Sequence, residues 1–223
     1  MNATEVSIPL ADALLAGDMS IPSRATGLVI FAHGSGSSRR SPRNQFVAGE
    51  LRRNNLGTFL FDLLTPKEEL TEARTRHLRF DISFLARRLV AATLWLAGEL
   101  SGRGLRFGYF GASTGAAAAL VAAAQLPETI ATVVSRGGRP DLAEPVLEQV
   151  KAPTLLIVGG EDTSVIALNE QAYSRLGCEK SLKIVPGASH LFEEAGALEV
   201  VAALATDWFL RHLAEPGIGR SSG

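Results

Sequence analysis

One short segment of the chain combines a candidate nucleophile with the glycines that a sharp turn needs. Residues 111–115 read Gly-Ala-Ser-Thr-Gly, a match to G-x-S-x-G, with an apolar aromatic run before them and a train of alanines after them. A serine held on a strained turn between a strand and a helix requires small residues two positions away on either side. Ser113 is therefore the candidate nucleophile, and a glycine-rich turn without chemistry is the alternative.

A serine hydroxyl attacks a carbonyl carbon only when a base accepts its proton, and an acid must orient that base. His190, in VPGASHLFEE, follows the last apolar stretch and is the candidate base, whereas His33, at the end of an earlier stretch, is expected to be structural. Asp162 follows LLIVGGE and is the candidate acid, with a helix N-cap as its alternative role. Asp141, after SRGGRP, is the second candidate for the acid.

The negative charge that forms on an attacked carbonyl oxygen is commonly held by two backbone N–H groups. One predicted donor is the N–H of Thr114, which directly follows the candidate nucleophile. The other is expected in the loop HGSGSS, with Ser35 as first choice and Gly36 as the alternative. A phosphate-binding loop is a competing interpretation, but neither this loop nor residues 111–115 match G-x-x-x-x-G-K-[ST]. We therefore predict an oxyanion hole and no nucleotide site.

Several arginines follow the stretches that carry these candidates. Guanidinium groups suit bidentate contacts with carboxylate or phosphate groups, so these side chains are candidates for binding an anionic group of a substrate. The alternative is that they are solvated or pair with nearby carboxylates. The candidates are Arg39, Arg40, Arg43 and Arg136.

The elements that must position these residues alternate in type along the chain. After an expected hairpin over residues 4–10 and 13–22, about six apolar stretches alternate with helical ones. The last three helical stretches cover residues 141–150, 164–177 and 191–213. Continuous apolar stretches are typical of strands buried on both faces, and parallel crossovers need covering helices. The sequence predicts an α/β fold: a mostly parallel sheet of seven to eight strands, with helices on both faces. Catalytic groups gather at the carboxyl ends of such strands, where all the candidates lie.

Composition excludes several classes of protein. The 223 residues predict one domain over residues 1–214 and a flexible tail over 215–223, and the formal net charge of −1 gives no long-range attraction to nucleic acid. A single cysteine, Cys178, rules out an intrachain disulfide framework and favours the cytoplasm. No segment reads as a signal peptide or a membrane span. No metal and no cofactor are expected.

Taken together, the motifs resemble those of the α/β-hydrolase superfamily and, more closely, its dienelactone-hydrolase-like branch. The resemblance covers nearly the whole chain and implies that Ser113 attacks, His190 shuttles the proton and Asp162 orients His190. Dienelactone hydrolases use a cysteine nucleophile, whereas this chain has Ser113 and its Cys178 lies far along the chain, so dienelactone is not the expected substrate. The motifs are FAHGSGSSRRSPRN, LLTPKEE, GASTGAAAAL, SRGGRPDLA, IVGGEDTSV and GASHLFEE.

The expected function is hydrolysis of small carboxylic esters, lactones or thioesters through an acyl-enzyme on Ser113. Only the connection over residues 65–80 is longer than minimal, so the site should have no large lid. The alternative is a non-catalytic protein of the hydrolase fold that binds a small ligand or partner. The expected partner is a small-molecule ester or lactone, without nucleic acid or membrane, and a monomer and a homodimer are both open.

Overall fold

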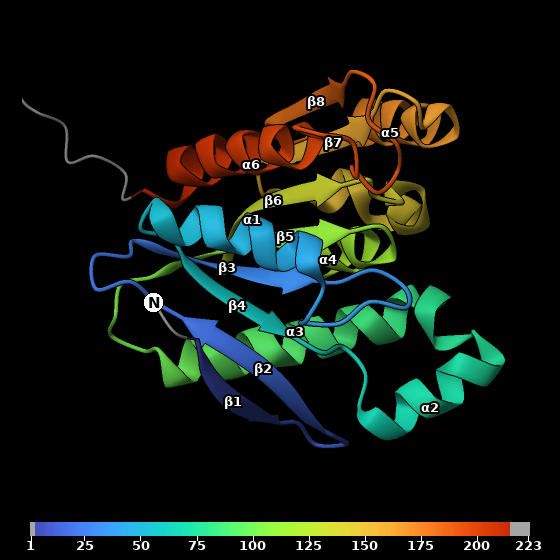
Figure 1. The fold of residues 1–223 in the computed structure, drawn as a ribbon. Coiled ribbons are helices and arrows are strands. Elements are labelled where there is room, and N and C mark those ends of the chain that lie inside the picture. The colour runs from blue at the N-terminus through green and yellow to red at the C-terminus, as the bar shows by residue number, and fades with distance from the viewer. Residues whose placement is uncertain (1–2, 215–223) are drawn as a thin grey trace, which may run out of the picture.

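Eight strands form one sheet in the computed structural model, which describes residues 3–214 (Figure 1). Their order is β1-β2-β4-β3-β5-β6-β7-β8. The first two strands form an antiparallel hairpin whose second strand pairs antiparallel with β4, and all the other pairings are parallel. The predicted α/β architecture with an N-terminal hairpin is thus confirmed. The strands are β1 (Thr4–Pro9), β2 (Leu14–Ser20), β3 (Gly27–Ala32), β4 (Gly57–Phe61), β5 (Arg106–Ala112), β6 (Ile130–Arg136), β7 (Thr154–Gly159) and β8 (Lys180–Val185).

Helices cover both faces of this sheet, because its central strands are apolar on both sides. Every residue of β3, β4 and β7 is buried. On one face lie α1 (Pro42–Arg53) and α6 (Ala197–Leu213), packed against one another (Figure 1). On the other face lie α3 (Ile82–Glu99), α4 (Thr114–Gln125), the 3-10 segment η2 (Pro140–Gln149) and α5 (Thr163–Arg175). None of the helices within residues 3–214 is both long and apolar enough to cross a membrane.

Local side-chain bonds fix where the helices near the site begin. Ser41 caps α1 by accepting a hydrogen bond from the Asn44 N–H, and Pro42 occupies the first helical position, where no N–H is needed. The segment over residues 65–80 folds into α2 (Pro66–Thr75) and the short η1 (Leu78–Phe80), with a capping box between Thr65 and Glu68. This segment therefore has a defined structure and adds no large lid.

Two predicted helices differ from the observed ones. Residues 140–149 form a 3-10 helix, because Pro145 inside it cannot donate the hydrogen bond that an α-helix requires. The last helix begins at Ala197 and not near residue 191, because Gly196 in front of it has a left-handed φ of 82°. The preceding residues stay a loop, which carries His190. The predicted tail over residues 215–223 lies outside the described residues.

Candidate active site

Ser113 stands on a strained turn between β5 and α4. Its φ of 51° and ψ of −123° lie outside the regions that side-chain-bearing residues prefer. Two glycines make the turn sterically feasible: a Cβ on Gly111 would lie 2.4 Å from the Ala116 Cα, and one on Gly115 would lie 2.2 Å from the Ala32 carbonyl oxygen. The helix therefore packs directly against the strands, and the turn is held by the Ser113 N–H, which donates to the Arg136 carbonyl at 3.3 Å. We call this turn the elbow.

The structure brings the candidate base and the preferred candidate acid together. His190 Nδ1 and Asp162 Oδ2 lie 2.6 Å apart, a short charge-assisted hydrogen bond. Asp162 occupies the N-cap position of α5, yet its side chain caps nothing there and reaches His190 instead. Asp141, the second candidate acid, accepts two hydrogen bonds from the Arg139 guanidinium at 2.8 and 2.7 Å. Its carboxylate is engaged there and does not bond His190.

Backbone contacts hold the His190 loop close to the strand that carries the acid. The Glu161 N–H donates to the Ala188 carbonyl at 3.0 Å, and a Cβ on Gly159 would lie 2.4 Å from that same oxygen. Gly137, which has a φ of 51°, lies against this loop: a Cβ there would be 3.1 Å from the His190 carbonyl oxygen. Sequence reasoning missed Gly137, although a Gly-Gly pair directly after a buried strand is a usable signal.

The predicted oxyanion donors lie on two adjacent segments. The Thr114 N–H is the first of α4 and so has no acceptor within its helix. The N–H groups of Ser35 and Gly36 donate to no acceptor within residues 3–214. The hydroxyl oxygens of Ser35 and Thr114 are 3.0 Å apart, so the two segments are joined by a hydrogen bond. Gly36 follows with a left-handed φ of 66°.

His33 shapes the start of this loop and has no free ring nitrogen. Its Nε2 accepts a hydrogen bond from the Leu63 N–H at 3.0 Å, while Nδ1 lies 3.0 Å from the Gly34 carbonyl and donates to it. Burial lowers the pKa of His33, so the ring stays neutral, as this pair of bonds requires. The structural role expected for His33 agrees with this arrangement.

A cavity of about 250 Å³ joins these groups at the carboxyl edge of the sheet. Both Ser113 and His190 line it, together with Ser35 of the predicted oxyanion hole. Two arginines also line it, Arg43 and Arg136. The remaining lining residues are Gly34, Ser37, Ser41, Ala112, Gly137 and Leu191.

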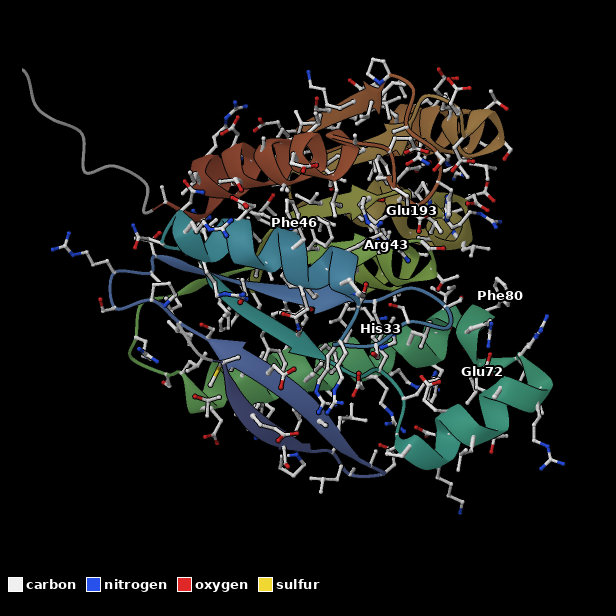
Figure 2. All side chains as sticks on the ribbon, viewed as in Figure 1. His33, Arg43, Phe46, Glu72, Phe80 and Glu193 are labelled. Carbon is white, nitrogen blue, oxygen red and sulfur yellow. The ribbon has the colours of Figure 1, made fainter. Side chains whose placement is uncertain are left out.

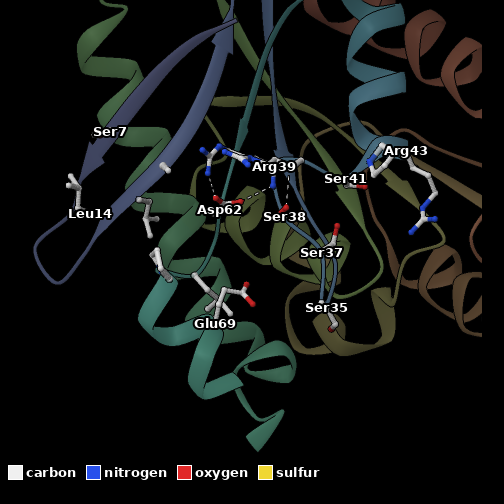
Figure 3. Close-up of a pocket in the computed structure, with 17 residues that line it drawn as sticks. Ser7, Leu14, Ser35, Ser37, Ser38, Arg39, Ser41, Arg43, Asp62 and Glu69 are labelled. Carbon is white, nitrogen blue, oxygen red and sulfur yellow. Dashed lines mark hydrogen bonds and ion pairs between the residues drawn. The ribbon is translucent and has the colours of Figure 1, made fainter. Parts of the chain in front are cut away.

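A second, larger cavity of about 650 Å³ holds the other two candidate arginines (Figure 3). It is lined by the loop over residues 35–43 and by the β1–β2 hairpin, and neither Ser113 nor His190 lines it. Here Arg39 forms ion pairs with Asp62, Glu5 and Asp18. Arg40 also lines this cavity, and its side chain is exposed. Arg43 lines both cavities, whereas Arg136 lines only the smaller one and Arg39 and Arg40 line only the larger one.

The chain is similar to several known proteins. Over 213 residues the chain is 53% identical to a Mycobacterium tuberculosis protein named "Putative phosphoribosyl transferase", matching 96% of this chain and 47% of that protein. The chain thus spans about half the length of the curated relatives it matches. A solved dienelactone hydrolase from Anabaena variabilis is 58% identical, with a TM-score of 0.93 over 96% of this chain and 100% of that one.

The fold alone is shared more widely. A Xanthomonas campestris protein described as an α/β serine hydrolase without a lid has a TM-score of 0.76 at 19% identity, over 96% of this chain and 97% of that chain. The model of the dienelactone hydrolase family matches residues 66–213, which include the elbow, Asp162 and His190. The chain therefore belongs to the dienelactone hydrolase family, within the α/β-hydrolase superfamily.

Proposed function

We propose that this hydrolase cleaves small carboxylic esters, lactones or thioesters through an acyl-enzyme on Ser113. The observation that carries the proposal is the 2.6 Å bond between Asp162 and His190, made where His190 lines the same cavity as the strained Ser113. Asp162 stands at the N-cap position of α5, but its side chain bonds His190 and caps no N–H of that helix, which is not the usual role of an N-cap aspartate.

Acylation follows from these positions. Asp162 accepts a hydrogen bond from the Nδ1–H of His190. This bond favours the tautomer whose Nε2 carries no proton, so Nε2 can take the Ser113 proton as Oγ attacks the carbonyl carbon. The developing oxyanion receives hydrogen bonds from the Thr114 N–H and from the Ser35 N–H or, as the alternative, the Gly36 N–H. The protonated His190 then gives its proton to the departing alcohol or thiol.

Deacylation uses the same groups in the opposite sense. His190 takes a proton from water as the water oxygen attacks the acyl carbon, and the bond from that carbon to the Ser113 Oγ then breaks. The proton on His190 returns to Oγ. The products are a carboxylic acid, which loses its proton to solvent at neutral pH, and free enzyme.

The size of the cavity supports small substrates. Its volume of about 250 Å³ lies below the roughly 300–1,000 Å³ typical of sites for drug-sized ligands. Short acyl groups therefore fit best, and activity should fall as the acyl chain lengthens. Whether the bond cleaved is an ester, a lactone or a thioester is decided by a substrate panel of each kind.

Covalent labelling tests the proposal directly. A fluorophosphonate probe should label the wild-type protein stoichiometrically and should not label Ser113→Ala, since the probe reacts with activated serines. Circular dichroism shows whether the variant is folded. A folded wild-type protein that is neither labelled nor active on p-nitrophenyl esters of two to eight carbons would favour a non-catalytic binder.

We infer that the transferase named in the Mycobacterium tuberculosis relatives is encoded in the part of those proteins that this chain does not match. This chain aligns with less than half of their length, and the dienelactone hydrolase model accounts for residues 66–213 of it. Assaying the two parts of such a relative separately, for ester hydrolysis and for phosphoribosyl transfer, tests this inference.

A further inference from the structure

Arg136 is a buried cation without a protein partner. It is the last residue of β6, it is only 7% exposed, and its guanidinium forms no hydrogen bond or ion pair with any residue in the range 3–214. The Nε atom is fully buried and unsatisfied, and the guanidinium carbon lies 5.8 Å from the centroid of the Phe192 ring, near the outer limit of a cation–π contact. Burying a charge in this way is costly unless something supplies the missing hydrogen bonds.

No carboxylate is among the residues of the range 3–214 that line the cavity beside Arg136. The other cation of the same cavity, Arg43, donates to Glu193 at 2.9 Å, and these two side chains lie side by side (Figure 2). The Arg43 charge is thus offset, so one positive charge, that of Arg136, remains uncompensated. Burial, with a smaller contribution from Arg43, lowers the pKa of Arg136 to about 10, so it stays protonated at neutral pH.

One excess positive charge in a cavity of about 250 Å³ matches a small monoanion. A carboxylate carries one negative charge and two oxygens in the geometry that a guanidinium fork binds. A phosphate monoester carries up to two charges and would leave the cavity with excess negative charge. Because Ser113 and Arg136 line the same small cavity, any carboxylate bound there lies near the nucleophile.

We propose that Arg136, assisted by Arg43, forms a carboxylate-binding site inside the catalytic cavity, and that its ligand is the acid released by hydrolysis. This assignment of the ligand rests on the proposed function. When the bond between the acyl carbon and the Ser113 Oγ breaks, the acid forms within this cavity and loses its proton to solvent. The resulting carboxylate pairs with Arg136 and blocks the next substrate, so the enzyme is inhibited by its own acid product.

Binding is measured first, because it does not depend on catalysis. Acetate and butyrate are titrated calorimetrically into wild-type protein and into Ser113→Ala, with acetamide and butyramide as neutral analogues of the same shape. Both proteins should bind the carboxylates at least about tenfold more tightly than the amides, the effect of one charge-assisted hydrogen bond. Equal affinity for acid and amide would overturn the proposal, and tighter binding of inorganic phosphate would overturn the assignment to a carboxylate.

Inhibition is measured next, with a neutral short-chain p-nitrophenyl ester as substrate. Butyrate should inhibit wild-type enzyme competitively, and butyramide should not. In Arg136→Met, which removes the charge but keeps much of the side-chain volume, the inhibition constant for butyrate should rise at least about tenfold. Arg136→Lys should retain part of the inhibition. The matched control is Arg139→Met, three residues on, whose guanidinium is already paired with Asp141.

A second variant covers the case in which Arg136→Met does not fold. Arg43→Gln removes a cation that lines the cavity and leaves its partner Glu193 unpaired, so it should weaken butyrate binding several-fold. Unchanged binding in Arg43→Gln and in whichever Arg136 variant folds would overturn the proposal. If no ester is cleaved but acetate binding still depends on Arg136, the carboxylate site stands and the proposed hydrolysis fails. If esters are cleaved but the acid does not inhibit, the proposed hydrolysis stands and the carboxylate site fails.

Discussion

The hydroxyl oxygens of Ser35 and Thr114 lie 3.0 Å apart and join the loop after β3 to the first turn of α4. These two segments carry the two N–H groups that we assign to the oxyanion hole. Thr114 is 2% exposed and fixed by its helix, whereas Ser35 belongs to a loop rich in glycine and serine. The hydroxyl bond therefore holds the less constrained donor at a fixed distance from the more constrained one.

Ser35→Ala should lower kcat for ester hydrolysis about five- to tenfold with little change in KM. The substitution keeps the backbone N–H but removes a hydrogen bond of about 1 kcal/mol that positions it. Ser37→Ala is the matched control, since Ser37 lines the same cavity and its hydroxyl bonds no other residue within 3–214. Equal effects of the two substitutions in steady-state assays would contradict this role.

Asp162→Asn should lower kcat by about 10³- to 10⁴-fold, because the amide favours the wrong ring tautomer of His190. Asp141→Asn tests the second candidate acid and removes the same single negative charge as Asp162→Asn. Since Asp141 bonds Arg139 and not His190, that variant should keep kcat within about twofold of the wild type. The opposite ranking of the two variants would assign the role of the acid to Asp141, in η2 after β6.

Gly137→Ala should reduce kcat about 10- to 100-fold, because the added Cβ would lie 3.1 Å from the His190 carbonyl and displace that loop. Gly104→Ala is the control for backbone strain. Gly104 also has a left-handed φ, 66° against 51°, but no atom lies within 4 Å of its Cβ position. Both variants should unfold more easily, by about 1 kcal/mol, and only the first should lose activity.

The folded protein should lose stability below about pH 6.5 in part through His33. Burial lowers the pKa of His33 in the folded state, so the unfolded state binds more protons as the pH falls below 6.5. The contribution of His33 to the free energy of unfolding is fully present above that pH. It declines as the pH falls towards the lower folded-state pKa, by at most about 1.4 kcal/mol per pH unit. Urea unfolding from pH 5 to 8 should give a smaller slope for His33→Gln. The pKa of His212 is also lowered, but His212 is present in both proteins, so its contribution cancels from the difference between their slopes. Identical slopes would contradict this prediction.

Arg39→Met should destabilise the fold by about 3 kcal/mol or more, because it leaves Asp62 and Asp18 close together without their shared cation. Any change in activity per folded molecule should be equal on a carboxylate-bearing ester and on a neutral ester of the same length, since Arg39 does not line the cavity that holds Ser113. Denaturant unfolding and paired kinetics measure the two effects. Arg40→Met, on the adjacent exposed side chain, should stay within about 0.5 kcal/mol of wild type.

The architecture could be predicted from the sequence because local patterns specify it. Continuous apolar runs require strands buried on both faces, and parallel strands require crossover helices, so the α/β fold followed from the order of the segments. The elbow could also be predicted from the sequence, since only glycines at 111 and 115 permit the close contacts of these positions with Ala116 and Ala32. Residues 141–150 were expected to be helical, and the internal Pro145 is the local reason why the observed element, over residues 140–149, is a 3-10 helix.

The partners of charged side chains were decided by the tertiary structure alone. Arg39 and Arg136 look alike in sequence, each following a predicted strand. Arg39 nevertheless pairs with three carboxylates, whereas Arg136 pairs with none in the part of the chain that the structure describes. The difference arises because β2 and β4 bring Asp18 and Asp62 to one edge of the sheet, while the β6 end faces the His190 loop. Residue types determined which chemistry is available to this protein. Long-range packing, which local sequence does not encode, determined which charges stay free.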